Sequence, residues 1–376
     1  MNKNFMMRPD NRDDLGDNPL ASKQARYDYI RVFLTVLVVL GHCAYLEVDT
    51  PFGGICYESQ LEAMGYAVST GIRPFVSAFS SMVYAFHMPA FIALSGALFI
   101  KGYDNGKWSS FSRLLKAKFS RILLPCIVVW FAYNVPLKFI SGYYDDSSLS
   151  RAFLQFFFPN NVYLWYLESL FLCFILAWLI LRFSGKNIKS LVIVIILWAV
   201  GYLLQHRNAA YVPLGNPFKN LFWFWMGVYI DSVAAWIDDR IKNNRAFVCV
   251  ILTALWFVLY FALVMIVKAH LTLWKETILP FAAIIVIWLD TVAIERKAKS
   301  NELIGRISSY TYGVYLYAEP WNYVVLWAMA QVAGVAVLGT VEGTVIEFLL
   351  RSVGTTVIGV IITWFLKWIK FPVKAY

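Results

Sequence analysis

Hydrophobic runs of about twenty residues recur along almost the whole chain, and this feature limits the fold more than any other. A run of this length forms a helix that can cross the hydrocarbon core of a bilayer. Apolar residues make up 60% of the 376 residues and charged residues only 15%, unlike the balance of a soluble domain. We therefore expect an all-α, polytopic integral membrane helix bundle that is embedded in the lipid bilayer.

Hydropathy and length predict ten spans. They lie at residues 29–48, 77–99, 122–140, 162–183, 188–205, 218–234, 246–267, 276–293, 308–332 and 346–368. Short connections join them, so residues 27–376 are expected to form one membrane domain behind a flexible cytoplasmic tail over residues 1–26. The five cysteines stand singly, mostly inside spans, and are expected to be core residues rather than disulfide partners.

Lys and Arg are distributed unevenly over the connections, and this bias predicts the orientation. If the N-terminus is cytoplasmic, the inside segments hold 24 of the 33 Lys and Arg residues and the outside segments hold eight, while Arg31 lies within the first span. Because basic loops are retained in the cytoplasm, both termini are predicted to be cytoplasmic. The same bias explains the net charge of +10 without a nucleic-acid partner.

The first span carries a polar stripe on an otherwise apolar helix. At 100° per residue, Asp28, Arg31, Thr35 and His42 fall within about 60° of one another. Arg31 and His42 are aligned but about 16 Å apart along the axis, so they cannot touch. The alternative is a snorkelling arginine and a hydrogen-bonded structural histidine, but the shared stripe favours a functional role.

The second span contains His87 beside Pro89. The proline should kink this helix and leave carbonyl groups free, so His87 is either a second catalytic candidate or a structural histidine bound to such a carbonyl. Further along the same helix, Ser95 and Gly96 allow a close approach of a neighbouring helix.

Two carboxylates also lie within predicted spans. Glu168 is at the same depth as His42, so it either fixes the tautomer of this imidazole or lines the outer vestibule. Glu319 lies near the middle of the ninth span, before a helix-kinking proline, and is a weaker candidate of the same kind.

The connection between the second and third spans is basic. Closely spaced cations such as Arg113, Lys118 and Arg121 suit phosphate and pyrophosphate groups, although membrane topology alone would also place basic residues there. No metal-ligand cluster, phosphate-binding glycine loop or nucleic-acid module is evident, so neither a metal nor a nucleic acid is expected as a ligand.

Several of these residues together resemble the acyltransferase 3 family of membrane proteins. The family shows Asp, then Arg three residues on, then His eleven further on, and here these are Asp28, Arg31 and His42. The Phe-rich second span ending in Ser-Gly, the basic stretch from Lys118 to Arg121 before a proline, and the LWYL of the fourth span are also similar. Many members place a histidine where this chain has Ala318, beside Glu319.

The resemblance implies an enzyme of ten transmembrane helices that takes an acyl group, most often acetyl, from acyl-CoA. The acceptor would be a hydroxyl of a cell-surface or lipid-linked polysaccharide, and a bacterial inner membrane is the expected location. We expect His42 to be the general base, and Arg31 and the basic loop to bind the donor. The alternative is a multi-pass transporter, which would also carry ionisable groups and broken helices in the membrane.

Overall fold

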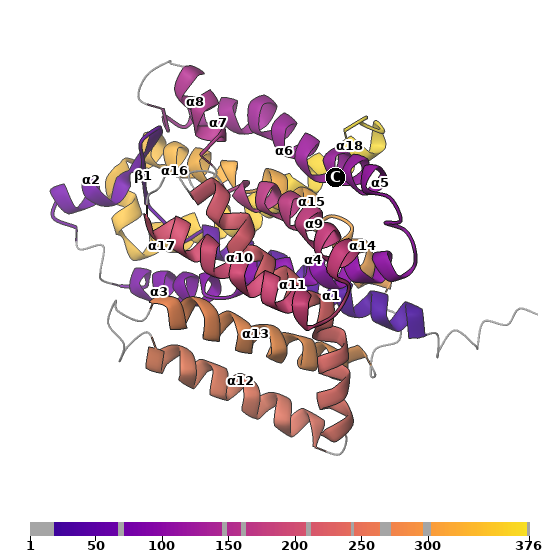
Figure 1. Cartoon of the computed structure of the whole chain (residues 1–376). Helices are drawn as coiled ribbons and strands as arrows, with labels where there is room; N and C mark the ends of the chain where they lie inside the picture. Colours follow the sequence, from indigo (N-terminus) through magenta and orange to yellow (C-terminus); the bar gives the residue numbers. More distant parts are fainter. Residues whose placement is uncertain are drawn as a thin grey trace, which may run out of the picture.

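The computed structural model describes residues 19–66, 71–144, 149–158, 163–207, 212–241, 244–263, 272–295 and 302–373. These ranges are almost entirely helical (Figure 1). The helices are α1 (Pro19–His42), α2 (Tyr57–Ala63), α3 (Arg73–Tyr84), α4 (His87–Asp104), α5 (Phe111–Lys118), α6 (Leu124–Val129), α7 (Val135–Ile140), α8 (Leu149–Phe156), α9 (Trp165–Ser184), α10 (Ile188–Arg207), α11 (Val212–Arg240), α12 (Arg245–Phe261), α13 (Thr272–Glu295), α14 (Glu302–Ser308), α15 (Thr311–Tyr317), α16 (Pro320–Ala333), α17 (Val341–Leu349) and α18 (Thr355–Trp368). Short π-helical segments at Phe119–Leu123, Trp130–Asn134 and Leu350–Gly354 join α5 to α6, α6 to α7 and α17 to α18.

Five helical stretches in the described ranges are long and apolar enough to cross a membrane. They are Arg73–Asp104, Phe111–Ile140, Trp165–Ser184, Ile188–Arg207 and Val341–Trp368. The other five predicted spans also fall on helices, namely α1, α11, α12, α13 and the pair α15 and α16. The prediction of a helical membrane protein is therefore confirmed, whereas the total of ten spans and the cytoplasmic termini stay predictions.

Large apolar side chains cover the outer helices instead of avoiding the surface. On α10 they include Ile195 and Leu203, and on α12 they include Phe247 and Val250, each at least 44% exposed. A soluble monomer rarely exposes apolar surface on this scale, whereas a bilayer requires it. In Figure 1, α12 lies at one edge of the bundle beside α13, and α10 and α11 lie on the side of α13 that faces away from α12.

The first span differs from the prediction at both ends. Helix α1 begins at Pro19, inside the segment predicted as a flexible tail; residues 1–18 of that tail lie outside the described ranges. The helix ends at His42, six residues earlier than predicted, and the chain continues into an antiparallel hairpin of β1 (Glu47–Thr50) and β2 (Gly53–Cys56). The hairpin corrects the strict all-α prediction, and His42 becomes the last residue of the helix.

Helices α4 and α11 pack in close contact through two glycines. A Cβ atom on Gly96 would lie 2.0 Å from the carbonyl oxygen of Phe224, and one on Gly227 would lie 1.9 Å from that of Ala93. Only hydrogen fits at either position, which confirms the close approach predicted from Ser95 and Gly96.

Replacement of Gly227 by valine is expected to destabilise the bundle by about 3 kcal/mol or more, because the backbone of α4 cannot move away without repacking. Thermal unfolding of the detergent-purified protein measures this. Gly305→Ala is the matched control, since a Cβ at Gly305 meets nothing within 4 Å. Equal melting temperatures for the two variants would contradict the packing argument.

Two breaks in long helical stretches face the interior of the bundle. The second span breaks between α3 and α4, just before His87, and the ninth breaks between α15 and α16 at Ala318 and Glu319. In each case a proline lies in the first turn of the helix that follows the break, as the sequence indicates. It is Pro89 in α4 and Pro320 in α16. Helix α1 contacts α3, α4, α13, α14 and α15. His42 of its polar stripe lines one cavity with His87 and a second, narrow one with Ala318 and Glu319, so the stripe lies beside both breaks.

Candidate active site

The polar stripe of α1 begins with an ion pair. Arg31 Nη1 lies 2.8 Å from Asp28 Oδ1 and 2.7 Å from the hydroxyl oxygen of Ser308. The same hydroxyl donates to Asp28 Oδ1 at 2.7 Å, so the three groups form a closed triangle. Asp28 and Ser308 thereby hold the Arg31 guanidinium in one orientation.

The guanidinium lines a cavity of about 700 Å³, which we call the basic cavity. Arg31, Lys118 and Arg121 supply its cations, and Ser95 and Tyr166 are among its other polar residues. A groove of about 590 Å³ shares Lys118 and Arg121 with it and adds Lys107 and Arg113. The structure thus brings together the cations predicted to bind an anionic group.

Lys118 occupies a special position among these cations. Its Nζ lies 3.4 Å from the centre of the Phe174 ring and 5.0 Å from that of Trp108, within the range of cation–π attraction. Two aromatic rings therefore hold an ammonium group at the junction of the basic cavity and the groove. Within the described ranges, no carboxylate forms an ion pair with Lys118 or Arg121, which leaves their charge available to an anionic ligand.

A second cavity, of about 460 Å³, contains the histidines, and we call it the histidine cavity. His42 at the end of α1, Tyr84 at the end of α3 and His87 at the start of α4 line one side. Polar residues of α10, α11 and α13 and two indoles also line it: Gln205, Asn216, Lys219, Asn220, Glu276, Trp165 and Trp223.

Tyr84 stands between the two imidazoles. Its hydroxyl lies 3.1 Å from His42 Nδ1, and its ring packs edge-on against both histidines, with centroid distances of 5.7 Å to His42 and 5.0 Å to His87. His87 Nδ1 lies 2.8 Å from the carbonyl oxygen of Val83. A carbonyl only accepts, so this bond fixes the proton of neutral His87 on Nδ1 and leaves Nε2 as an acceptor.

The bond from His87 to Val83 is the contact expected of a structural histidine at a broken helix. His87 nevertheless also lines the histidine cavity, so the geometry keeps both roles that the sequence allowed.

Glu168 is not the partner of His42. Its Oε1 is buried without a hydrogen-bond partner in the described residues, and neither cavity includes Glu168 in its lining. Equal depth in the membrane was the basis for pairing them, but depth does not specify which way a helix faces. The polar neighbour of the His42 ring is Tyr84.

Glu319 lies behind the histidine cavity, at the break between α15 and α16. Its Oε1 accepts a hydrogen bond of 3.2 Å from the Tyr45 hydroxyl, while its Oε2 is buried without a hydrogen-bond partner in the described residues. Together with Ala318, Thr35 and His42 it lines a narrow gap between the two cavities. A carboxylate therefore lies near His42, but it is Glu319 and not Glu168.

The two cavities are neighbours that share part of their lining. Met88 and Tyr315 line both of them, and the narrow gap shares Thr35 with the basic cavity and His42 with the histidine cavity. Arg31 and His42 lie about 16 Å apart along α1, one on each cavity. The cations therefore line one cavity and the imidazoles line the adjacent one.

Comparison with known proteins gives one match. The family model described as an acyltransferase domain, Acyl_transf_3, matches residues 24–367, which is nearly the whole chain. No curated protein and no solved structure matches the chain.

Proposed function

This chain belongs to the Acyl_transf_3 family of acyltransferase domains, and from that membership we propose that it transfers an acetyl group from acetyl-CoA to a carbohydrate hydroxyl, with His42 as general base. The single observation that supports this proposal best is the pair of adjacent cavities, which share Met88 and Tyr315 as lining residues. One presents cations and the other presents imidazoles, as a transfer between an anionic donor and a neutral acceptor requires.

The donor is assigned to the basic cavity and its groove. Acetyl-CoA carries phosphate and pyrophosphate groups at its nucleotide end, and Arg31, Lys118, Arg121 and Arg113 offer charge-assisted hydrogen bonds to them. The pantetheine arm would extend past Met88 and Tyr315 and bring the thioester to His42.

The acceptor is assigned to the histidine cavity. Its volume of about 460 Å³ lies within the range of small-molecule sites, and its mixture of amides, indoles and an ion pair suits a sugar. Lys219 Nζ and Glu276 Oε2 lie 2.5 Å apart, so the pair offers a donor and an acceptor with little net charge.

The chemistry requires one proton transfer in each direction. A hydroxyl is a weak nucleophile until a base removes its proton, so the lone pair of His42 Nε2 takes that proton as the oxygen attacks the thioester carbon. The carbon–sulfur bond then breaks, and the imidazolium returns the proton to the leaving thiolate. In this tautomer His42 Nδ1 donates to the Tyr84 oxygen, so that Tyr84 orients the imidazole.

Replacement of Tyr84 by phenylalanine is expected to lower kcat roughly 2- to 10-fold, because the change removes one hydrogen bond to the base and leaves the ring in place. The KM for acetyl-CoA should stay the same, since Tyr84 lines the histidine cavity and not the basic one. Steady-state kinetics of the purified variant measure both values. A raised donor KM at unchanged kcat would contradict this role.

The test of the proposed function is release of free thiol from acetyl-CoA by protein in nanodiscs, with and without methyl glycosides of common hexoses. Release stimulated by a glycoside supports the proposal. Uptake of a sugar into vesicles without consumption of acetyl-CoA would instead favour transport.

The proposed setting is the inner membrane of a bacterium, with ten spans and both termini in the cytoplasm. The basic groove then opens to the side on which acetyl-CoA is made, and the histidine cavity lies toward the side on which surface glycans are exposed. The charge bias of the connections supports this orientation.

A further inference from the structure

Helix α1 ends inside the protein, at the residue proposed to be the base. The last four carbonyl groups of an α-helix have no partner within the helix and need one elsewhere. Here these are the carbonyls of Val39, Leu40, Gly41 and His42. The hydrogen-bond donors that these carbonyl groups find determine how firmly the end of α1, and with it His42, is held.

All four carbonyls have a partner. Cys43 satisfies two of them, with its thiol 3.0 Å from the Val39 oxygen and its N–H 3.2 Å from the Leu40 oxygen. The Ser80 hydroxyl of α3 donates to the Gly41 oxygen at 2.8 Å. The His42 oxygen accepts from Arg351 Nη2 at 2.9 Å, and Arg351 Nη1 reaches onward to the Tyr45 oxygen at 2.8 Å.

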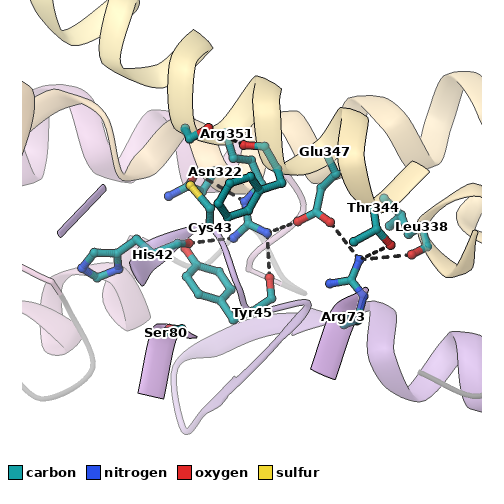
Figure 2. Close-up of polar contacts among 12 residues, drawn as sticks. His42, Cys43, Tyr45, Arg73, Ser80, Asn322, Leu338, Thr344, Glu347 and Arg351 are labelled. Carbon is teal, nitrogen blue, oxygen red and sulfur yellow. Dashed lines mark hydrogen bonds and ion pairs between the residues drawn. The ribbon is translucent and has the colours of Figure 1, made fainter. Parts of the chain in front are cut away.

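Arg351 therefore spans the turn that follows α1 and binds it on both sides. Figure 2 shows the imidazole of His42 pointing away from Arg351 while its carbonyl faces the guanidinium. A cation at this place also interacts favourably with the negative end of the helix dipole. The same guanidinium lies over the Tyr45 ring at 4.6 Å and donates to Asn322 Oδ1 at 3.3 Å.

The charge of Arg351 is compensated within the protein. Its side chain is 0% exposed and forms an ion pair with Glu347, whose other oxygen lies 2.8 Å from Arg73 Nη2. Arg73 also donates to the Thr344 hydroxyl and the Leu338 carbonyl (Figure 2). Of the two arginines that pair with Glu347, Arg351 is the one that bonds to α1, through the His42 carbonyl. Variants of the two arginines can therefore be compared.

We propose that Arg351 is a positioning residue for the acyl-transfer reaction, which fixes the end of α1 and thereby the orientation of His42. Arg73 anchors Glu347 from the opposite side, and its polar partners in the described residues are Leu338, Thr344 and Glu347, none of which belongs to α1. The catalytic part of this inference rests on the proposed role of His42, whereas the structural part does not.

Alkylation of Cys43 by N-ethylmaleimide tests the structural part without any activity assay. The Cys43 thiol is 1% exposed beside His42, whereas Cys56 is exposed and serves as an internal reference. The folded protein is labelled in nanodiscs and then digested. Mass spectrometry of the peptides gives the ratio of the Cys43 alkylation rate to the Cys56 alkylation rate. We expect this ratio to rise at least 10-fold in Arg351→Gln and less than 3-fold in Arg73→Gln.

Two further variants keep the test decisive if Arg351→Gln does not fold. Arg351→Lys keeps the charge but loses the two-carbonyl fork, and Ser80→Ala removes the Gly41 partner without touching a buried charge. Both should raise Cys43 labelling relative to Cys56. Wild-type ratios in both variants, or equal ratios in the Arg351→Gln and Arg73→Gln proteins, would overturn the structural part.

Kinetics test the catalytic part. Arg351→Lys should lower kcat at least 5-fold with donor KM unchanged, and it should change the residual thiol release of His42→Ala less than 2-fold. A difference of this kind identifies an effect that acts through His42. General destabilisation would lower the activity of the wild-type and His42→Ala proteins by the same factor. The contrary result is that Arg351→Lys lowers thiol release by the same factor in the wild-type and His42→Ala proteins while still raising Cys43 labelling. That result would show that Arg351 has a structural role only, and it would refute the catalytic part but not the structural part.

Discussion

Replacement of His42 by alanine is expected to reduce acetyl transfer about 10²- to 10⁴-fold, the range that a general base contributes. The side chain is partly buried at the end of α1, and its ring contacts Tyr84 and lines the histidine cavity. The helix-ending bonds to Arg351 and Ser80 involve backbone atoms, so they survive the change. Membrane insertion and abundance should therefore match the wild type.

The matched control is His206→Ala. His206 lies on α10, bonds through Nδ1 to the Tyr202 carbonyl 2.9 Å away, and lines neither cavity. It should retain full activity, and His87→Ala should fall between the two. Wild-type transfer in the His42→Ala protein would remove the base from the mechanism.

Joint replacement of Lys118 and Arg121 by glutamine is expected to raise the KM for acetyl-CoA roughly 10- to 100-fold, as expected when hydrogen bonds to charged groups are lost. Both cations line the basic cavity and the groove beside it. Because neither residue lines the histidine cavity, kcat at saturating donor should change less than about threefold. Initial rates over a range of acetyl-CoA concentrations measure the two constants.

Lys116→Gln is the control for general loss of positive charge. Lys116 lies on the same helix α5, is exposed and lines neither the basic cavity nor the groove. Its KM should equal that of the wild type, and high salt should weaken donor binding mainly in proteins that keep Lys118 and Arg121. A loss of kcat without a change of KM in the double variant would place the donor elsewhere.

Much of the fold follows from hydrophobicity alone. Within the described residues each predicted span falls largely on helix, because a bilayer selects long apolar segments, and the close approach at Gly96 follows from its lack of a side chain. The end of α1 did not follow from hydropathy, since residues up to 48 are nearly as apolar as the helix. Partners distant in sequence, Ser80 and Arg351, end it at His42.

The candidate site was partly predictable for the same reason. Helical spacing along α1 aligned Asp28, Arg31 and His42, and the basic loop indicated Lys118 and Arg121. No hydrogen bond joins Glu168 to His42 in the described residues, because depth in the membrane does not specify rotation about the helix axis. Tyr84 carried no signal, since tyrosines are common in this chain.

Arg351 did carry a signal that was missed. Arg351 lies five residues inside the predicted span at residues 346–368, one helical turn after Glu347. A charge within a span is costly unless it has a partner, and such residues usually have a function. Ser308 is different, because a serine near the end of a helix has many ordinary explanations. Only the folded structure brings it to Arg31.

Transfer of the acetyl group to a sugar, with His42 as the base, is tested by following the acetyl group itself. Nanodisc-embedded protein is incubated with [¹⁴C]acetyl-CoA and the panel of methyl glycosides, and the products are separated. We expect radioactivity on a glycoside as an alkali-labile ester in wild type, and its loss in His42→Ala. Radioactivity that stays on CoA in folded wild-type protein with every glycoside, or equal esters from both proteins, would contradict it.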